Sequence, residues 1–359
     1  MATNTSPGLY LYAFIPTNLD IIFDTQAAAD DDTVYTIVDD GLAAVVSASA
    51  LPDYRGLSRS QAVQYLVAHQ RVIETVMQTF PLLPVKFGTV LADEAQVRCL
   101  LKQGRERFCE ALNKLTGQVQ MEVVVLWNVA DVFKEITTEE PIMRIRTQIA
   151  NRPPEETLDE RVELGKIVQQ SLFHHRSALS EFIIPPLREV ALDVTSNPLM
   201  DDSMVTNVAL LVDAPGRQAL EERIMQMDAA FASGRQHAPG NSPLTFRFVG
   251  PLPPYNFATV EAVAPPIEVV DAARKLLELP ETVTPYELKR AYHGQAALLH
   301  PDQNPNLVDA EAQMTALSQA YNLLRRYALA REMAGDSSCS FAPQTVKETI
   351  LIDILRQEV

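Results

Sequence analysis

The chain has 359 residues, of which 47% are hydrophobic and 21% charged, and its formal net charge is −16 at pH 7. This length exceeds the usual size of one hydrophobic core and predicts two or three domains, and the composition is that of a water-soluble globular protein. The acidic balance argues against non-specific binding to nucleic acid, because a phosphate backbone requires a surface rich in lysine and arginine.

The first third of the chain alternates strand and helix patterns. Residues 8–15 (GLYLYAFI) are rich in the aromatic and β-branched side chains that strands favour. Asp40-Gly41 stands between two further strand-like runs and is typical of a two-residue hairpin, because both turn residues take positive φ. Two amphipathic helices follow, and Gly117 ends the second. The pattern predicts an α+β domain over residues 1–117, with strands at 8–15, 34–38 and 42–49 and helices at 58–77 and 93–115.

A second set of patterns predicts another α+β domain over residues 118–264. The apolar run at 119–127 (VQMEVVVLW) has the length and composition of a buried strand. Residues 132–189 are mostly helical in pattern, with breaks at Pro141 and at Pro153-Pro154. We interpret this long helical part as an insertion into the domain. A strand, a helix and two strands are expected after it, at 204–215, 216–232, 244–250 and 255–263.

Pro265-Pro266 marks the boundary after which strand patterns stop. Residues 267–335 read as helices only, and we expect a separate all-α domain there. The tail, residues 336–359, begins with polar sequence and then carries apolar residues at helical spacing between Val346 and Leu355. We expect a short amphipathic helix that docks on its own protein or, as the alternative, on a partner.

The cysteines and the amino terminus indicate the cellular compartment. Three cysteines occur without CxxC spacing, so neither a disulfide framework nor a zinc site is predicted. The first residues lack a basic stretch followed by an apolar one, and no apolar run is long enough to cross a bilayer. No glycine-rich phosphate-binding motif is present. We therefore expect a cytoplasmic protein without a metal or cofactor.

Four segments together resemble the gas vesicle accessory proteins of the GvpF/GvpL family. They are GLYLYAFI, a helix carrying His69 that leads into LLPVKFGTVL, the helical segment ERVELGKIV, and GPLPPYNF. Their order and spacing carry the resemblance, which covers most of residues 8–263. It implies two α+β domains, the second related to a ferredoxin-like arrangement, and a minor component or assembly factor of gas vesicles. The positions that match the family motifs are Pro84, Lys86, Phe87, Gly88, Gly250, Pro251, Pro254, Tyr255 and Phe257.

The segment GPLPPYNF also has an interpretation from its residues alone. Its three prolines and Gly250 fix an extended or turning backbone, and we expect Tyr255 and Phe257 to anchor it. This predicts a rigid loop packed on its own sheet. Leu252 stands where the family resemblance leads us to expect an aromatic residue.

The segment VKFGTVL is interpreted in the same way. We expect Phe87 to fill the core, Gly88 to adopt an unusual backbone angle, and Lys86 to be solvated or paired. The alternative is a contact surface for shell protein. Lys86 stands where the resemblance leads us to expect arginine.

Residues 267–335 resemble a J-domain of the DnaJ type. The stretch TPYELKRAYHGQAALLHPDQNP opens with a capping box at Thr284, which specifies the start of a helix. Its apolar positions are matched by those of a second helix after a loop, as in an antiparallel hairpin. We expect the loop to hold His300, Pro301 and Asp302 at an exposed tip.

The His-Pro-Asp tripeptide is not expected to be catalytic, because a loop between two helices supplies neither a cleft nor an orienting partner. In J-domains the tripeptide engages a DnaK-type ATPase chaperone and promotes ATP hydrolysis. The resemblance carries that role to His300, Pro301 and Asp302, with Lys289 and Arg290 on the preceding helix. Two nearby carboxylates balance these two cations, so electrostatic steering should be weak. A relic fold kept for packing is the competing interpretation.

The combined resemblances imply a non-enzymatic accessory protein of gas vesicle formation. We expect it to cover apolar shell subunits transiently and to release them to the growing shell. The expected partners are shell protein, other gas vesicle accessory proteins and a DnaK-type chaperone, but neither nucleic acid nor membrane. The alternative is a co-chaperone whose first two domains only select clients. A third possibility is a structural component that stays in the vesicle wall.

Overall fold

The computed structural model describes residues 8–27, 33–49, 54, 56–239, 243–299 and 309–357. Its contacts divide the chain into two compact units. In the first, the residues up to Thr116 join Ala258–Leu355, and in the second, Gly117–Phe257 join the residues from Arg356 onward. Both contain helices and strands, which confirms the predicted α+β class. No helix in the described ranges is both long enough and apolar enough to cross a membrane.

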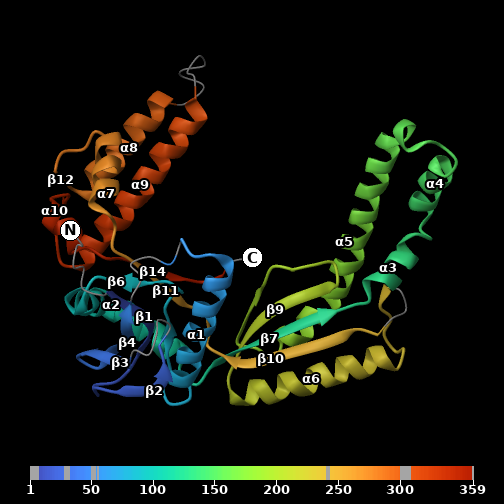
Figure 1. Ribbon diagram of the computed structural model, residues 1–359, viewed down its shortest axis with the longest axis horizontal. Coiled ribbons are helices and arrows are strands. Elements are labelled where there is room, and N and C mark those ends of the chain that lie inside the picture. The colour runs from blue at the N-terminus through green and yellow to red at the C-terminus, as the bar shows by residue number, and fades with distance from the viewer. Residues whose placement is uncertain are drawn as a thin grey trace. The chain divides into compact units, whose positions relative to one another are not determined.

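An antiparallel sheet forms the centre of the first unit. Its strands are β1 (Gly8–Ile15), β2 (Ile22–Gln26), β3 (Thr33–Asp39), β4 (Leu42–Ser49), β5 (Leu83–Pro84) and β6 (Val90–Leu91). The strand order is β2-β3-β4-β1-β5, and β6 also pairs with β1 (Figure 1). Asp40 and Gly41 make the predicted turn between β3 and β4, with φ of 44° and 87°.

Two helices pack on this sheet, and both start at a side-chain cap. α1 (Arg59–Met77) begins after Ser58, which forms a capping box with Gln61. The sequence had offered Ser58 or Ser60 as this cap. α2 (Glu94–Leu115) begins after Asp93, whose carboxylate accepts a hydrogen bond from a backbone N–H of the first turn. On β1, Tyr12 stacks with a side chain of α1, whereas Phe14 stacks with one of α2. β1 is therefore buried by both helices.

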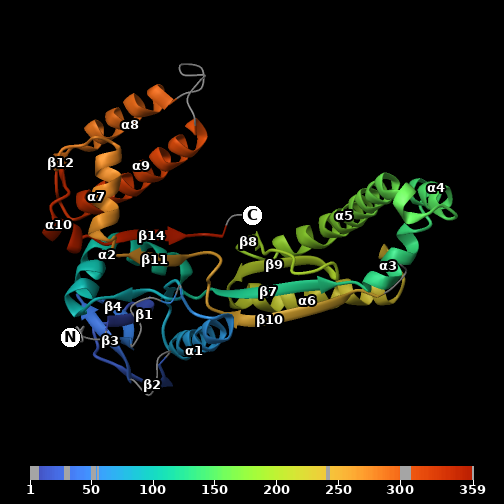
Figure 2. The ribbon, with the colours of Figure 1, turned by 45° about the horizontal axis from the view of Figure 1, so that its top comes forward.

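A second sheet in the first unit joins segments that are far apart in sequence. β11 (Thr259–Val263) pairs antiparallel with β14 (Leu351–Leu355), and Figure 2 shows the two strands side by side. On its other side β11 meets the chain that follows β5. Val85 and Val260 form a parallel bridge there, and the Lys86 N–H donates to the Val260 carbonyl at 2.8 Å.

The remaining part of the first unit is mainly helical. α8 (Pro285–Leu299) and α9 (Ala310–Met333) form the predicted hairpin, and α7 (Ile267–Leu276) packs on α9 (Figure 1). Tyr292 and Tyr321 stack between the hairpin helices with ring centroids 4.2 Å apart. After α9, β13 (Cys339–Ser340) pairs with β12 (Thr282–Val283), and α10 (Pro343–Lys347) contacts α7. The sequence pattern had predicted helices only.

The predicted carboxyl-terminal helix is wrong in its second half. α10 ends at Lys347, and Leu351–Leu355 is the strand β14. A short isolated helix is marginal, whereas β11 offers a row of backbone donors and acceptors with which these residues pair. The structure also groups β11 with the first unit, although the sequence had placed it at the end of the second domain.

The second unit has the ferredoxin-like topology that the family resemblance implied. Its strands are β7 (Val119–Leu126), β8 (Asp193–Ser196), β9 (Met204–Val212) and β10 (Thr245–Leu252). Their order, β10-β7-β9-β8, is antiparallel throughout and places the first and third strands at the centre. β8 has only four residues, DVTS, and was not predicted because it lacks an apolar pattern.

The helical insertion lies in the first crossover of this unit. α3 (Val129–Ile136), α4 (Glu140–Ile149) and α5 (Leu158–Arg188) connect β7 to β8, and a single turn at Pro154–Glu156 separates α4 from α5. α6 (Ala214–Ala232) connects β9 to β10. Apolar residues of α5 and α6 share one buried cluster with alternate residues of β7, including Val123 and Val125. One face of the sheet is therefore the core of the unit.

Candidate functional site

The segment after β5 holds the first group of predicted site residues. Pro84 is buried in β5 and pairs with Ala13 of β1. The Lys86 ammonium group forms an ion pair with Glu261 of β11, with Nζ and Oε1 2.6 Å apart, although 53% of the lysine side chain is exposed. Of the two states expected for Lys86, the structure therefore contains the paired one.

Gly88 meets the requirement predicted from sequence. Its φ of 82° lies in the left-handed region that glycine adopts without strain. A Cβ at this position would lie 3.1 Å from the Cβ of Tyr54. The Gly88 N–H donates to the Tyr10 hydroxyl at 3.1 Å, so the turn is also held by a hydrogen bond to β1.

His69 lies behind this turn and is 2% exposed. The Tyr10 hydroxyl lies 2.9 Å from its Nδ1 and accepts a hydrogen bond from the Gly88 N–H. Burial lowers the pKa of His69 to about 4, and a hydrogen bond to the backbone of Val85 offsets part of this effect. The imidazole is therefore neutral at pH 7 and connects α1, β1 and the turn.

Phe87 closes the aromatic cluster around this histidine. Its ring packs edge-on against His69 and Tyr54, with centroids 5.7 and 5.8 Å away. Phe87 is half-buried, so it packs at the rim of the cluster and does not fill the core as the sequence had predicted. From the sequence, His69 was noted only as part of a family motif, and its role in the core was not predicted. A lone histidine within an apolar helical stripe is the signal for its structural role.

The second group of predicted site residues lies in the second unit. Gly250 has a φ of 142°, and a Cβ there would lie 2.7 Å from the Met121 sulfur and 3.0 Å from the Gln120 carbonyl oxygen. Only glycine permits this close approach to β7. Gly250, Pro251 and Leu252 belong to the end of β10 and not to a loop, and Pro251 is exposed. The rest of the motif is a packed loop as predicted, with Pro254 and Phe257 buried and Tyr255 half-buried.

Asn256, inside the same motif, is the centre of a buried amide network that was not predicted. Its backbone N–H and side-chain oxygen bond to the Gln120 side chain at 3.0 and 2.9 Å. Its Nδ2 donates to Asn197 at 2.5 Å and to the Gln357 side chain at 2.8 Å. Asn256 is 7% exposed and Gln120 1%. Amide hydrogen bonds therefore join four chain segments, and Gln120 Nε2 also donates to the Glu122 carboxylate at 3.1 Å.

The predicted chaperone-binding residues fall partly outside the described ranges. This applies to His300, Pro301 and Asp302. Lys289 and Arg290 are exposed on α8, and neither is within 4 Å of a carboxylate among the described residues. The capping box at the start of α8 is present, because the Thr284 N–H and hydroxyl bond to the Glu287 carboxylate at 2.8 and 2.9 Å. The assigned role of these residues stays a prediction.

Two parts of the chain are similar to known protein families. A family model described as "Gas vesicle synthesis protein GvpL/GvpF" matches residues 8–259. The chain belongs to this family. Gas vesicle protein F of Microcystis aeruginosa is 23% identical over 254 residues, which are 70% of this chain and 98% of that protein. Gas vesicle protein L1 of Halobacterium salinarum is 25% identical over 270 residues, 70% of this chain and 91% of that protein.

Solved structures support the fold, and a second family model covers the hairpin. The crystal structure of GvpF from Anabaena sp. PCC7120 matches with a TM-score of 0.54 and 23% identity, over 70% of this chain and 97% of that chain. A model described as "DnaJ domain" matches residues 275–332. The chain is 42% identical to chaperone protein DnaJ of Protochlamydia amoebophila over 50 residues. These residues make up 14% of this chain and 13% of that protein. Both resemblances stated from sequence are confirmed.

Proposed function

We propose that this protein is a non-enzymatic assembly factor that binds the apolar shell protein of gas vesicles and assists vesicle nucleation or growth. Membership of the GvpL/GvpF family across residues 8–259 is the observation that carries the proposal. The protein acts in the cytoplasm at gas vesicles, with shell protein and other accessory proteins as its partners.

The charge of the chain suits this task. Apolar subunits associate wrongly through exposed edges and patches unless another protein covers them. A partner with a net charge of −16 makes each complex repel the next one. The assembly factor therefore delays association of shell protein without any chemical step.

The docking surface that we assign to shell protein is the outer face of α1. Val63, Leu66 and Val67 are 52%, 48% and 53% exposed there. Their i, i+3, i+4 spacing places them on one side of the helix, next to one another. The polar residue Gln64 is exposed on the same helix and provides a matched position for comparison.

Replacing Val63 and Val67 together by aspartate should weaken capture of purified shell protein at least tenfold. Burying one such side chain contributes roughly 1.5 to 3 kcal/mol, and the new carboxylates would also have to be desolvated. The measurement is the amount of shell protein kept in solution across a concentration series of this chain. Gln64→Asp is the control and should leave capture unchanged. Equal capture by all variants would remove α1 from the proposal, whereas no capture by the unaltered chain would end the proposal itself.

A second function is favoured by the helical hairpin. α8 and α9 have the hairpin form, residues 275–332 match the DnaJ-domain model, and Lys289 and Arg290 are exposed without ion-pair partners in the described part of the chain. In this candidate, the segment recruits a DnaK-type ATPase to clients that the α+β regions select.

The full chain should then raise the ATP turnover of a DnaK-type chaperone several-fold, and Asp302→Asn should return turnover to the basal rate. The resemblance assigns the chaperone contact to the tripeptide that contains Asp302. Asp309→Asn, at the start of α9, keeps the same chemical change outside the tripeptide and should retain stimulation. If the unaltered chain leaves the ATP turnover of the chaperone at its basal rate, the second function is ruled out and the hairpin has only a packing role.

A further inference from the structure

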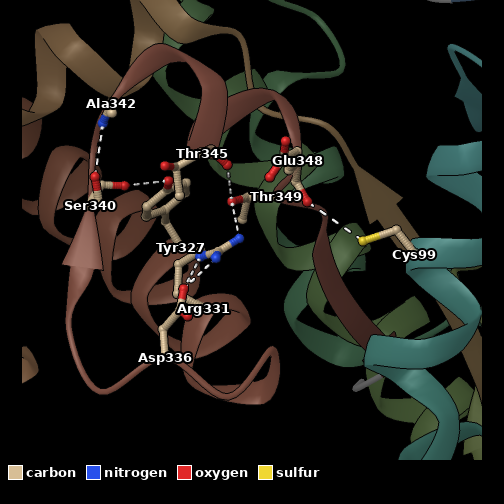
Figure 3. A network of polar contacts seen from close by, with 9 residues as sticks. All are labelled: Cys99, Tyr327, Arg331, Asp336, Ser340, Ala342, Thr345, Glu348 and Thr349. Carbon is tan, nitrogen blue, oxygen red and sulfur yellow. Dashed lines mark hydrogen bonds and ion pairs between the residues drawn. The ribbon is translucent and has the colours of Figure 1, made fainter.

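Residues 336–355, the carboxyl-terminal strap, run back along the helical segment after α9. They lie beyond both family-model matches. Figure 3 shows the polar contacts of the strap with α9: the Tyr327 hydroxyl donates to the Ser340 carbonyl at 2.7 Å, and Arg331 pairs with Asp336. Arg331 also donates to the Thr349 hydroxyl at 3.4 Å. The strap is therefore fixed to the same helix that forms one arm of the hairpin.

The strap is also held by donors of α2. Cys99 Sγ lies 3.6 Å from the Glu348 carbonyl oxygen (Figure 3), and the Arg107 guanidinium donates to the Ile352 carbonyl at 3.0 Å. Leu351 and Ile352 are buried at the start of β14. Through β14 the helical segment is therefore attached to the α+β part of the same unit.

Four charges meet where β14 pairs with β11. Glu261 and Asp353 are directly opposite each other in the register. Like charges at opposed positions of paired strands are destabilising, so this pair requires cations. Arg326 of α9 pairs with Asp353 and lies 3.6 Å from Glu261, and Lys86 pairs with Glu261 at 2.6 Å. Arg326 and Lys86 thus approach the acidic pair from the helical segment and from the VKFGTVL segment.

We propose that the strap is a charge-dependent latch, in which Lys86 and Arg326 hold β14 on β11 by neutralising Glu261 and Asp353. Lys86 is the most exposed of the four, at 53% against 23% to 35% for the others. A partner carboxylate that binds Lys86 withdraws it from Glu261, and repulsion across the strands then loosens β14. Because the strap continues into its contacts with α9, the state of the VKFGTVL segment sets how firmly the helical segment is held.

The latch is tested by hydrogen–deuterium exchange of peptides covering Leu351–Leu355 in the full chain. Lys86→Ala should speed exchange about threefold and Arg326→Ala about tenfold, because the first leaves one cation at the acidic pair and the second removes the cation shared by both acids. In a Glu261→Gln background, Lys86→Ala should have no further effect. This non-additivity separates the latch from a general loss of stability.

Lys289→Ala is the matched control, because this lysine is exposed on α8 of the same unit without an ion pair in the described ranges. It should leave exchange of β14 unchanged. Exchange of β9, in the second unit, reports that each variant is folded. Unchanged exchange of β14 in both Lys86→Ala and Arg326→Ala would overturn the proposal. An equal effect of Lys86→Ala with and without Glu261→Gln would overturn it as well.

Discussion

Lowering the pH from 7 to 4 should cost the first unit about 3 kcal/mol of stability through His69 alone. The pKa of His69 is about 4 in the folded chain and 6.5 when exposed. Between these values the unfolded state binds a proton that the folded state does not, so stability falls as the pH falls. The loss begins near pH 6.5 and is complete once the pH is below about 4. A difference of this size between the two pKa values corresponds to about 3 kcal/mol.

The measurement is urea unfolding followed by circular dichroism at several pH values, for the unaltered chain and for His69→Gln. Carboxyl groups titrate in both chains, so the pH-dependent difference between them isolates the histidine. Glutamine keeps a donor and an acceptor near Tyr10 and Val85 but does not titrate, and its free energy of unfolding should depend less on pH between 6.5 and 4. Parallel pH profiles would show that His69 is charged, or exposed, in the folded protein.

Asn256→Leu should lower the free energy of unfolding of the second unit by about 3 kcal/mol. Leucine has a similar size and keeps the backbone N–H that donates to Gln120, but it removes the side-chain oxygen that accepts from Gln120 Nε2. An unsatisfied buried polar group costs roughly 1 to 3 kcal/mol. The Asn197 and Gln357 side chains lose a donor at the same time. The fluorescence of Trp127, the single tryptophan of the chain and buried in this unit, reports the urea transition.

Asn151→Leu provides the control for this substitution. Asn151 is an exposed asparagine of the same unit, and the same change there should alter the free energy of unfolding by no more than about 0.5 kcal/mol. If both variants unfold at the same urea concentration, the amide network contributes no net stability.

The elements predicted best are those whose signals are local. Thr284 opens α8 as predicted, and Ser58, one of two serines that the sequence offered, caps α1. A cap acts within one helical turn, so its signal is local. The Asp40-Gly41 turn was predictable for the same reason. β14 was misread because its apolar residues also fit a helical stripe, and the free edge of β11 that decides between the two is distant in sequence. Short polar strands such as β8 carry no periodic signal.

The same distinction applies to the candidate sites. The left-handed backbone of Gly88 was predictable because it is a local feature, whereas the close approach of Gly250 to β7 joins distant residues and was not. The partner of His69 is Tyr10, 59 residues earlier, and no local pattern connects the two. Asn256 belongs to the GPLPPYNF motif, but its hydrogen-bond partner Gln120 is 136 residues away in sequence. Hydrogen bonds between residues far apart in sequence could therefore not be predicted.

The pairing of β11 with β14 also orders events on the ribosome. β11 is synthesised before the entire helical segment, and its partner strand emerges only after that segment is finished. At about 5 to 20 residues per second, the edge of β11 waits roughly ten seconds for the strand that covers it. An uncovered strand edge is prone to mispairing during such a delay. The J-like helices are synthesised during this delay, directly after the strand whose edge is still uncovered.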